Sequence, residues 1–225
     1  MAMAEKTIFL ILAAAVCAAS AQFPAHHPHL HGGCDGTLTV DENGVAFTGQ
    51  KGHAWRWKLE DIEELRLAPD RVTVLTYVDN QWLLGRDRRY TFLGKVPAAE
   101  LYVLLRPSME KRLVAEIATP INSPAWSIAV KHLGRVAGSQ GTLAFGENAV
   151  VYTTASKDDS RTWLYSDIDT ISTSGPFQLT ITTFERERLQ YGDRRGFNFQ
   201  LKEPIAEAKY NQLWLQVERK NGRLP

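Results

Sequence analysis

The chain has 225 residues, of which 44% are hydrophobic and 23% are charged, an ordinary composition for a globular protein. Its length suffices for one large domain or two small ones. The 26 basic and 25 acidic residues leave a net charge of +1, whereas a surface for nucleic acid or anionic membrane usually shows a basic excess. The charge balance therefore argues against both kinds of partner.

The first 21 residues predict a secretory signal peptide. A charged start with Glu5 and Lys6 is followed by an apolar run over 7–16 and by Ala19-Ser20-Ala21, the usual order for a cleaved leader. The apolar run is shorter than the roughly 20 residues that span a bilayer. We expect cleavage after Ala21 and a secreted or periplasmic protein. An uncleaved anchor and a lipoprotein on Cys17 are the alternatives.

Cysteine usage follows from this cleavage. The mature chain would keep Cys34 as its one thiol, so no intramolecular disulfide is expected. An odd thiol in an oxidising compartment can link two chains. We therefore expect either a dimer through Cys34 or a small, half-buried residue near a strand start.

Residues 22–35 are predicted to form a His-rich N-terminal tail, because 22–33 (QFPAHHPHLHGG) is rich in turn residues and lacks periodicity. Neutral imidazoles bind soft divalent ions, and Cys34 offers a further ligand. The alternative is a flexible segment without a metal. His132-Leu133 echoes His29-Leu30, which suggests that one histidine belongs to a repeat. The candidate metal ligands are His26, His27, His29 and His31.

An internal repeat organises the rest of the chain. Gly36-Thr37-Leu38 opens a first copy, and Gly141-Thr142-Leu143 opens a second one 105 residues later. Alternating apolar residues on both sides of 41–44 predict a β-hairpin, whose Asn-Gly pair tolerates positive φ. The second hairpin turns at 146–149. The repeat predicts two domains.

Further strands and a closing helix are expected in each copy. In the first copy, residues 98–105 show helical spacing behind Pro97. Pro107 should stop this helix, and Ser108 should cap a second short helix that runs through Ile117. Residues 119–124 (TPINSP) are the expected linker. The predicted strands of the first copy are Ala54–Leu59, Ile62–Leu67, Arg71–Tyr77, Gln81–Leu84 and Arg89–Leu93.

The second copy repeats this order after a strand that begins at Trp126. Trp163 takes the place of Trp57, and Asp167-Ile168 takes the place of Asp61-Ile62. The closing helix is clearer here, because apolar residues recur on one face at i, i+4, i+7, i+8 and i+11. They are Ala206, Tyr210, Leu213, Trp214 and Val217.

About seven short antiparallel strands followed by one amphipathic helix, twice, resemble the pleckstrin-homology-like (PH-like) superfold, including its GRAM-type members. The resemblance covers 36–106 and 141–220 and rests on the shared openings G-T-L-x-x-x-x-N-x-V and on W-x-x-x-D-I. It implies a mainly β fold with one closing α-helix per unit, that is, two PH-like, partly open β-barrels in tandem. The units would be 36–118, with a trailing helix, and 125–225. It also implies that the helices plug the barrels with Tyr102 and Leu105, and with Tyr210 and Trp214.

The resemblance implies a binding module. Members that bind phosphoinositides use basic residues around the first hairpin, but the hairpin turns here carry Asp41, Glu42 and Glu147. No phosphoinositide, nucleic acid or cofactor is therefore expected. The expected partner is a protein or a component of the cell envelope.

Two motifs offer binding residues. An Asp-Arg-Arg core precedes the last strand of each unit, and arginine forks bind carboxylate or phosphate; a local ion pair at a turn is the alternative. Trp82 lies outside the shared pattern and is a candidate for contact with a partner, with packing as the alternative. The arginines are Arg88, Arg89, Arg194 and Arg195.

Catalysis is not expected, since the sequence has no G-x-S-x-G, H-E-x-x-H, G-x-x-x-x-G-K or paired C-x-x-C motif. Asp61, Asp167, His53 and His132 are the polar residues with most appeal, and both aspartates recur at strand starts, where they would serve the fold. We expect a non-catalytic binding protein. A metal-binding protein that uses the His-rich segment and a small-ligand-binding β-barrel are the alternatives.

Overall fold

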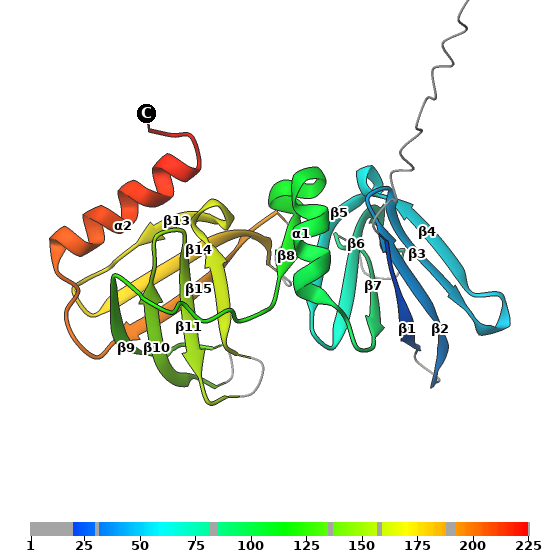
Figure 1. Cartoon of the computed structure of the whole chain (residues 1–225), viewed down its shortest axis with the longest axis horizontal. Coiled ribbons are helices and arrows are strands. Elements are labelled where there is room, and N and C mark those ends of the chain that lie inside the picture. Colours follow the sequence, from blue (N-terminus) through cyan, green and yellow to red (C-terminus); the bar gives the residue numbers. More distant parts are fainter. Residues whose placement is uncertain are drawn as a thin grey trace, which may run out of the picture.

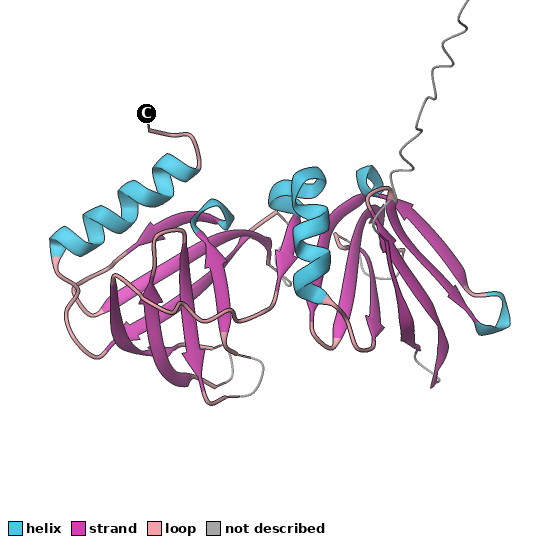
Figure 2. Ribbon diagram, in the orientation of Figure 1, coloured by secondary structure: helices cyan, strands magenta, loops and turns pink. Residues whose placement is uncertain are grey.

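The computed structural model describes residues 20–29, 32–81, 85–134, 137–156, 159–187 and 192–224. Residues 1–19 of the predicted signal peptide, His31 and Trp82 lie outside this part of the chain, as does most of the predicted strand Gln81–Leu84. Two sheets lie side by side, and each is followed by an α-helix (Figure 1). Strands dominate both halves (Figure 2). We call 20–118 the first half and 125–224 the second half.

The first sheet has eight strands in the order β4-β3-β2-β1-β7-β6-β5-β8. All neighbouring strands are antiparallel except β5 and β8, which are parallel. The strands are β1 (Ser20–His29), β2 (Gly32–Asp41), β3 (Gly44–Gly49), β4 (Ala54–Lys58), β5 (Ile62–Ala68), β6 (Arg71–Asp79), β7 (Asp87–Leu93) and β8 (Leu113–Ala115).

The second sheet has seven antiparallel strands in the order β12-β11-β10-β9-β15-β14-β13, the same order as β4 to β5 of the first sheet. The described part of the chain is therefore mainly β, with two sheets and two α-helices. The strands are β9 (Trp126–His132), β10 (Ser139–Phe145), β11 (Ala149–Thr154), β12 (Arg161–Leu164), β13 (Ile168–Ser172), β14 (Gln178–Arg186) and β15 (Arg194–Leu201).

The predicted N-terminal tail is wrong, because residues 22–35 form β1 and the start of β2. The two strands pair from Ser20–Asp41 to His29–Gly32. Phe23 and Ala25 are buried, while Pro24 and Pro28 face outward. The alternation of a strand is thus present, but the prolines conceal it in the sequence. Cleavage after Ala21 would remove the first two residues of β1.

Each half has its own hydrophobic core. One cluster of buried residues runs from Phe23 to Leu113 and a second from Ile128 to Val217. The predicted glycines at the hairpin openings have a packing reason: a Cβ on Gly36 would meet Thr48 O at 2.4 Å and the Phe47 ring at 2.7 Å. Gly141 lies in the same relation to Thr153 O and the Tyr152 ring.

The hairpin turn of the first half differs in detail from the prediction. Its central residues are Glu42 and Asn43, and Asp41 pairs with Gly44. Asp41 Oδ1 accepts hydrogen bonds from the backbone N–H groups of Asn43 and Gly44 at 2.8 and 3.0 Å. The aspartate therefore stabilises the turn, and neither residue of the Asn-Gly pair has positive φ.

Helix α1 (Ala98–Met109) does not stop at Pro107, and the second helix predicted to run through Ile117 is wrong. Leu101, Leu105 and Met109 form one buried face, so packing carries the helix past the proline. A short 3₁₀ turn (Glu110–Arg112) follows, and the apolar Leu113–Ala115 then joins the sheet edge as β8 beside β5.

Helix α2 (Glu207–Lys220) packs through Leu213 and Val217, with Tyr210 partly buried. Leu105 in α1 is buried in the first core as predicted, whereas the predicted insertion of Trp214 is wrong, because Trp214 is 40% exposed. At 100° per residue, Trp214 lies beside the stripe of Tyr210, Leu213 and Val217 rather than within it. No helix in the described residues is long and apolar enough to cross a membrane.

Candidate functional site

A cavity of about 740 Å³ opens at one end of the second sheet. Its walls come from the end of β9, from β11 and β12, and from the start of β15, while Arg71 and Glu116 of the first half complete it. Concave sites with a few convergent polar groups are where proteins most often bind small ligands. This cavity is the candidate binding site.

One wall of the cavity is a hydrogen-bonded polar cluster. His132 Nδ1 lies 3.3 Å from the Asp159 carboxylate, and the Ser139 hydroxyl donates to the same carboxylate. Tyr152 OH lies 2.7 Å from Ser139 Oγ. Because Asp159 bonds both His132 and Ser139, the three side chains do not form the relay of a hydrolase, in which the serine bonds the histidine.

Another part of the lining combines arginines with aromatic rings. The Phe197 ring lies 4.8 Å from the Trp163 ring, and the guanidinium carbons of Arg161 and Arg195 lie 5.3 and 4.8 Å from the Phe197 centroid. Guanidiniums stacked on rings make a flat surface with N–H donors at its edges. The wall therefore suits a flat ligand that carries an anionic group.

Two donors in this wall have no partner. Arg161 Nε and Trp163 Nε1 are buried and make no hydrogen bond to the described residues, although Arg161 is 7% and Trp163 is 3% exposed. An unpaired buried donor costs about 1–3 kcal/mol. The same side chains also line a second cavity of about 20 Å³, which has room for about one water molecule.

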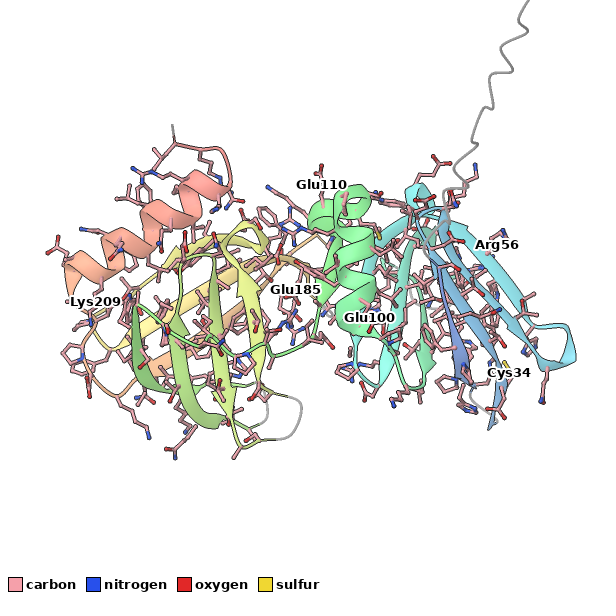
Figure 3. All side chains as sticks on the ribbon, viewed as in Figure 1. Cys34, Arg56, Glu100, Glu110, Glu185 and Lys209 are labelled. Carbon is pink, nitrogen blue, oxygen red and sulfur yellow. The ribbon has the colours of Figure 1, made fainter. Side chains whose placement is uncertain are left out.

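A buried ion network lies between the two halves, next to the cavity. Arg66 on β5 bonds Glu64 at 2.6 Å and reaches across to Glu185 on β14 at 3.2 Å. Figure 3 shows Glu185 where the two sheets meet. Arg161 bonds Glu185 at 2.6 Å, and Arg195 does so at 3.2 Å.

Glu116 is the other acceptor of this network. Its carboxylate lies within 4.0 Å of the guanidiniums of Arg66, Arg71, Arg161 and Arg195. Burial alone would raise the pKa of Glu116, but these four positive charges outweigh it and lower the pKa to about 2. Glu116 is therefore ionised throughout the physiological range and fixes the arginines around the cavity.

A third link between the halves surrounds Asp167. Tyr102 OH on α1 donates to Asp167 Oδ2 at 3.0 Å, and Arg106 forms an ion pair with Asp167. Burial raises the pKa of Asp167, which Arg106 opposes, and burial also raises the pKa of Tyr102. Asp61 instead accepts the backbone N–H of Lys58 at 3.2 Å. Both aspartates thus bind structural partners.

The predicted arginines separate into two pairs. Arg194 and Arg195 line the cavity, and Arg194 donates to Phe184 O at 2.8 Å. Arg88 and Arg89 are on β7 of the first half and do not line it. Trp82 lies outside the described residues.

The predicted metal ligands also separate. His26 faces Asp35, with Nδ1 2.8 Å from the carboxylate. His27 Nδ1 donates to Thr91 O at 2.8 Å, and burial lowers the pKa of its imidazole. His29 meets Cys34 and His53 instead. His31 lies outside the described residues.

Sequence reasoning missed the network residues Glu64, Arg66, Glu116, Arg161 and Glu185. Glu64 and Arg66 alternate with Leu65 and Leu67, a pattern typical of a strand with one solvated face. The alternation gave no sign that a second half covers that face. The one available signal of a buried ion pair was the presence of opposite charges at positions i and i+2 of the strand.

Comparisons with known proteins add little to this description. The sequence matches no model of a protein family and no curated protein. One similar solved structure is described as the structure of the Spt16D Pob3N heterodimer, with 12% identity and a TM-score of 0.34, covering 84% of this chain and 99% of that chain. A similarity at that TM-score carries no conclusion about this chain.

Proposed function

We propose that this chain is an exported, non-catalytic binding protein of two PH-like units, and that the cavity of the second half is its ligand site. The leader-like residues 1–21 support export, and the internal repeat supports two related units. The absence of nucleophile and metalloenzyme motifs from the sequence supports a binding role.

The single observation that carries the proposal is a pair of buried donors on residues of the cavity wall, Arg161 Nε and Trp163 Nε1, which have no hydrogen-bond partner among the described residues. Both atoms are covered in this structure, so an acceptor in the cavity would bond them after the two side chains shift. A carboxylate suits this role best, since its oxygens accept bonds from guanidinium and indole N–H groups together.

The rest of the ligand follows from the neighbouring side chains. Phe197 and Trp163 line the cavity although both residues are almost wholly buried, and Arg194 adds a half-exposed guanidinium. We therefore propose a ligand with a carboxylate on a flat apolar body. A protein or envelope component would supply the same chemistry through a carboxylate that it presents.

The test compares 2-naphthoate with the neutral 2-naphthamide by isothermal titration calorimetry. Hydrogen bonds to a charged group contribute about 1.5–3 kcal/mol, so the acid should bind at least about tenfold more tightly than the amide. Trp163→Phe removes the indole N–H and keeps a ring, and Arg194→Gln removes one guanidinium. Each should abolish most of the preference for the acid.

Arg88→Gln is the matched control, because it removes an arginine of the other Asp-Arg-Arg motif, remote from the cavity, and should change nothing. Thermal unfolding checks that each variant folds. Equal affinity for acid and amide, or a preference that survives both Trp163→Phe and Arg194→Gln, would reject the site.

Two further experiments distinguish a small natural ligand from an envelope component as the source of the carboxylate. A small natural ligand should appear as an added mass in native mass spectrometry of protein purified from its own cell. An envelope component should be retained by the wild-type protein and released by 2-naphthoate.

A further inference from the structure

Three side chains from separate segments meet at the corresponding end of the first sheet. His29 Nε2 lies 3.3 Å from Cys34 Sγ, and His53 Nδ1 lies 3.4 Å from the same sulfur. All three ligand atoms lie within 4.8 Å of one another. Cys34 is labelled in Figure 3, near the start of β2 and away from the junction of the halves.

The fold holds these side chains together. Cys34 stands opposite His27 in the β1–β2 pair, and His29 is two residues farther along the same face of β1. His53 follows the 3₁₀ turn Gln50–Gly52, and Gly49 N–H donates to its carbonyl at 2.7 Å. The cluster therefore rests on two paired strands and a hydrogen-bonded turn.

The histidine that belongs to the internal repeat is His27, which is not a member of this cluster. Cys34 pairs with His27, and Ser139, 105 residues later, pairs with His132. His27 and His132 both lie 5.1 Å from a phenylalanine ring, Phe92 and Phe199 respectively. His27 is thus the counterpart of His132, which corrects the predicted echo of His29-Leu30.

The cluster itself is particular to the first half. The counterpart of Cys34 is Ser139, and the residue 105 positions after His29 is Gly134. Ser139 and Gly134 lie at the cavity end of the second sheet. The second half therefore folds without a thiol or a second imidazole at these positions.

The geometry suits a metal ion. A tetrahedral zinc ion, with Zn–S of about 2.3 Å and Zn–N of about 2.0 Å, holds sulfur and nitrogen ligands about 3.5 Å apart. The observed separations of 3.3 and 3.4 Å are close to this value. Cys34 is 5% exposed, while both imidazoles reach solvent, which gives an ion a way in.

We propose that His29, Cys34 and His53 bind one zinc ion, with the fourth coordination position left to solvent or another donor. This site is distinct from the cavity of the second half and goes beyond the proposed ligand binding. It also engages the thiol that the predicted dimer would use.

The test uses Co²⁺ as a spectroscopic substitute for Zn²⁺. Purified reduced protein should bind one Co²⁺ per chain with a thiolate-to-cobalt charge-transfer absorption, and Zn²⁺ should displace it. Cys34→Ser should abolish this absorption, and His29→Ala and His53→Ala should each weaken Zn²⁺ binding at least about tenfold.

A control keeps the result specific. His26→Ala removes an imidazole paired with Asp35 and should leave cobalt binding unchanged. Circular dichroism establishes that each variant folds. Cobalt binding without a thiolate band, or binding lost in His26→Ala but kept in His53→Ala, would overturn the site without bearing on the cavity.

Discussion

Glu116 shows how one residue can hold the ligand site and the junction of the halves together. It lies just after β8, accepts hydrogen bonds from the guanidiniums of Arg66, Arg71 and Arg195, and forms an ion pair with Arg161. In a low-dielectric setting such a carboxylate stabilises the fold only while it is ionised. Its protonation should therefore loosen the junction.

This gives a pH prediction. The folded pKa of about 2 lies below the ordinary value of 4.5, so the stabilisation is fully present above pH 4.5 and is lost as the pH falls towards 2. The difference corresponds to roughly 3 kcal/mol. Urea unfolding at pH 7 and pH 3 should show that the free energy of unfolding falls more for the wild type than for Glu116→Gln.

Burial raises the pKa of Asp167, so this residue should make the protein more stable as the pH falls, the opposite of Glu116. The wild type and Glu116→Gln both contain Asp167, so its effect cancels in the comparison. Glu100→Gln, on the exposed side of α1, is the control and should keep the wild-type slope. Identical slopes for the wild type and Glu116→Gln would refute the role of this carboxylate.

Helix α2 shows what a periodic pattern can and cannot specify. Helical spacing correctly placed the element and its two buried residues, Leu213 and Val217. It could not decide which edge of a wide apolar stripe faces the core, because that depends on how the helix is rotated against β13. The prediction therefore placed Trp214 in the core, whereas in the structure the side chain that packs there is Leu213.

The resulting prediction is a contrast between neighbours. Leu213→Ala, at a site that is 2% exposed, should destabilise the protein by about 2–5 kcal/mol. Trp214→Ala should cost clearly less, since its ring is 40% exposed. Urea denaturation of the two variants measures both. A larger loss for Trp214→Ala would mean that the helix is rotated.

Strand β1 is an element that the sequence pattern did not predict. Hairpins with alternating apolar residues and clear turns were predictable, but Pro24, Pro28 and the histidines hid the alternation of β1. The counterpart strand β9, with Trp126, Ile128 and Val130, was recognised. Extending the 105-residue offset backwards from Gly36 would have found β1.

The two halves together explain why the candidate site was only half predictable. Arg194 and Arg195 stood out as a motif, whereas Arg66 and Glu185 are 119 residues apart and meet only through the packing of two sheets. A single sequence contains no signal for such a contact. Whether the halves are separate PH-like domains stays a prediction.

A fragment of residues 125–225 tests that division. It contains β9 to β15, α2 and the whole second core cluster, so it should unfold cooperatively. It should be less stable than the same half in the full chain, because Arg161 and Glu185 lose Glu116 and Arg66. Thermal unfolding by circular dichroism measures both properties. A disordered fragment would show that the two sheets form one folding unit.

The proposed ligand site has one direct test, the indole N–H resonance of Trp163 in a ¹H–¹⁵N NMR spectrum. Each of the six tryptophans has one indole N–H, and the signal that disappears in Trp163→Phe is that of Trp163. Titration with 2-naphthoate should move this signal downfield, because the indole N–H gains an acceptor, and 2-naphthamide should move it much less. A Trp163 signal that stays in place at saturating 2-naphthoate would contradict the cavity as the ligand site.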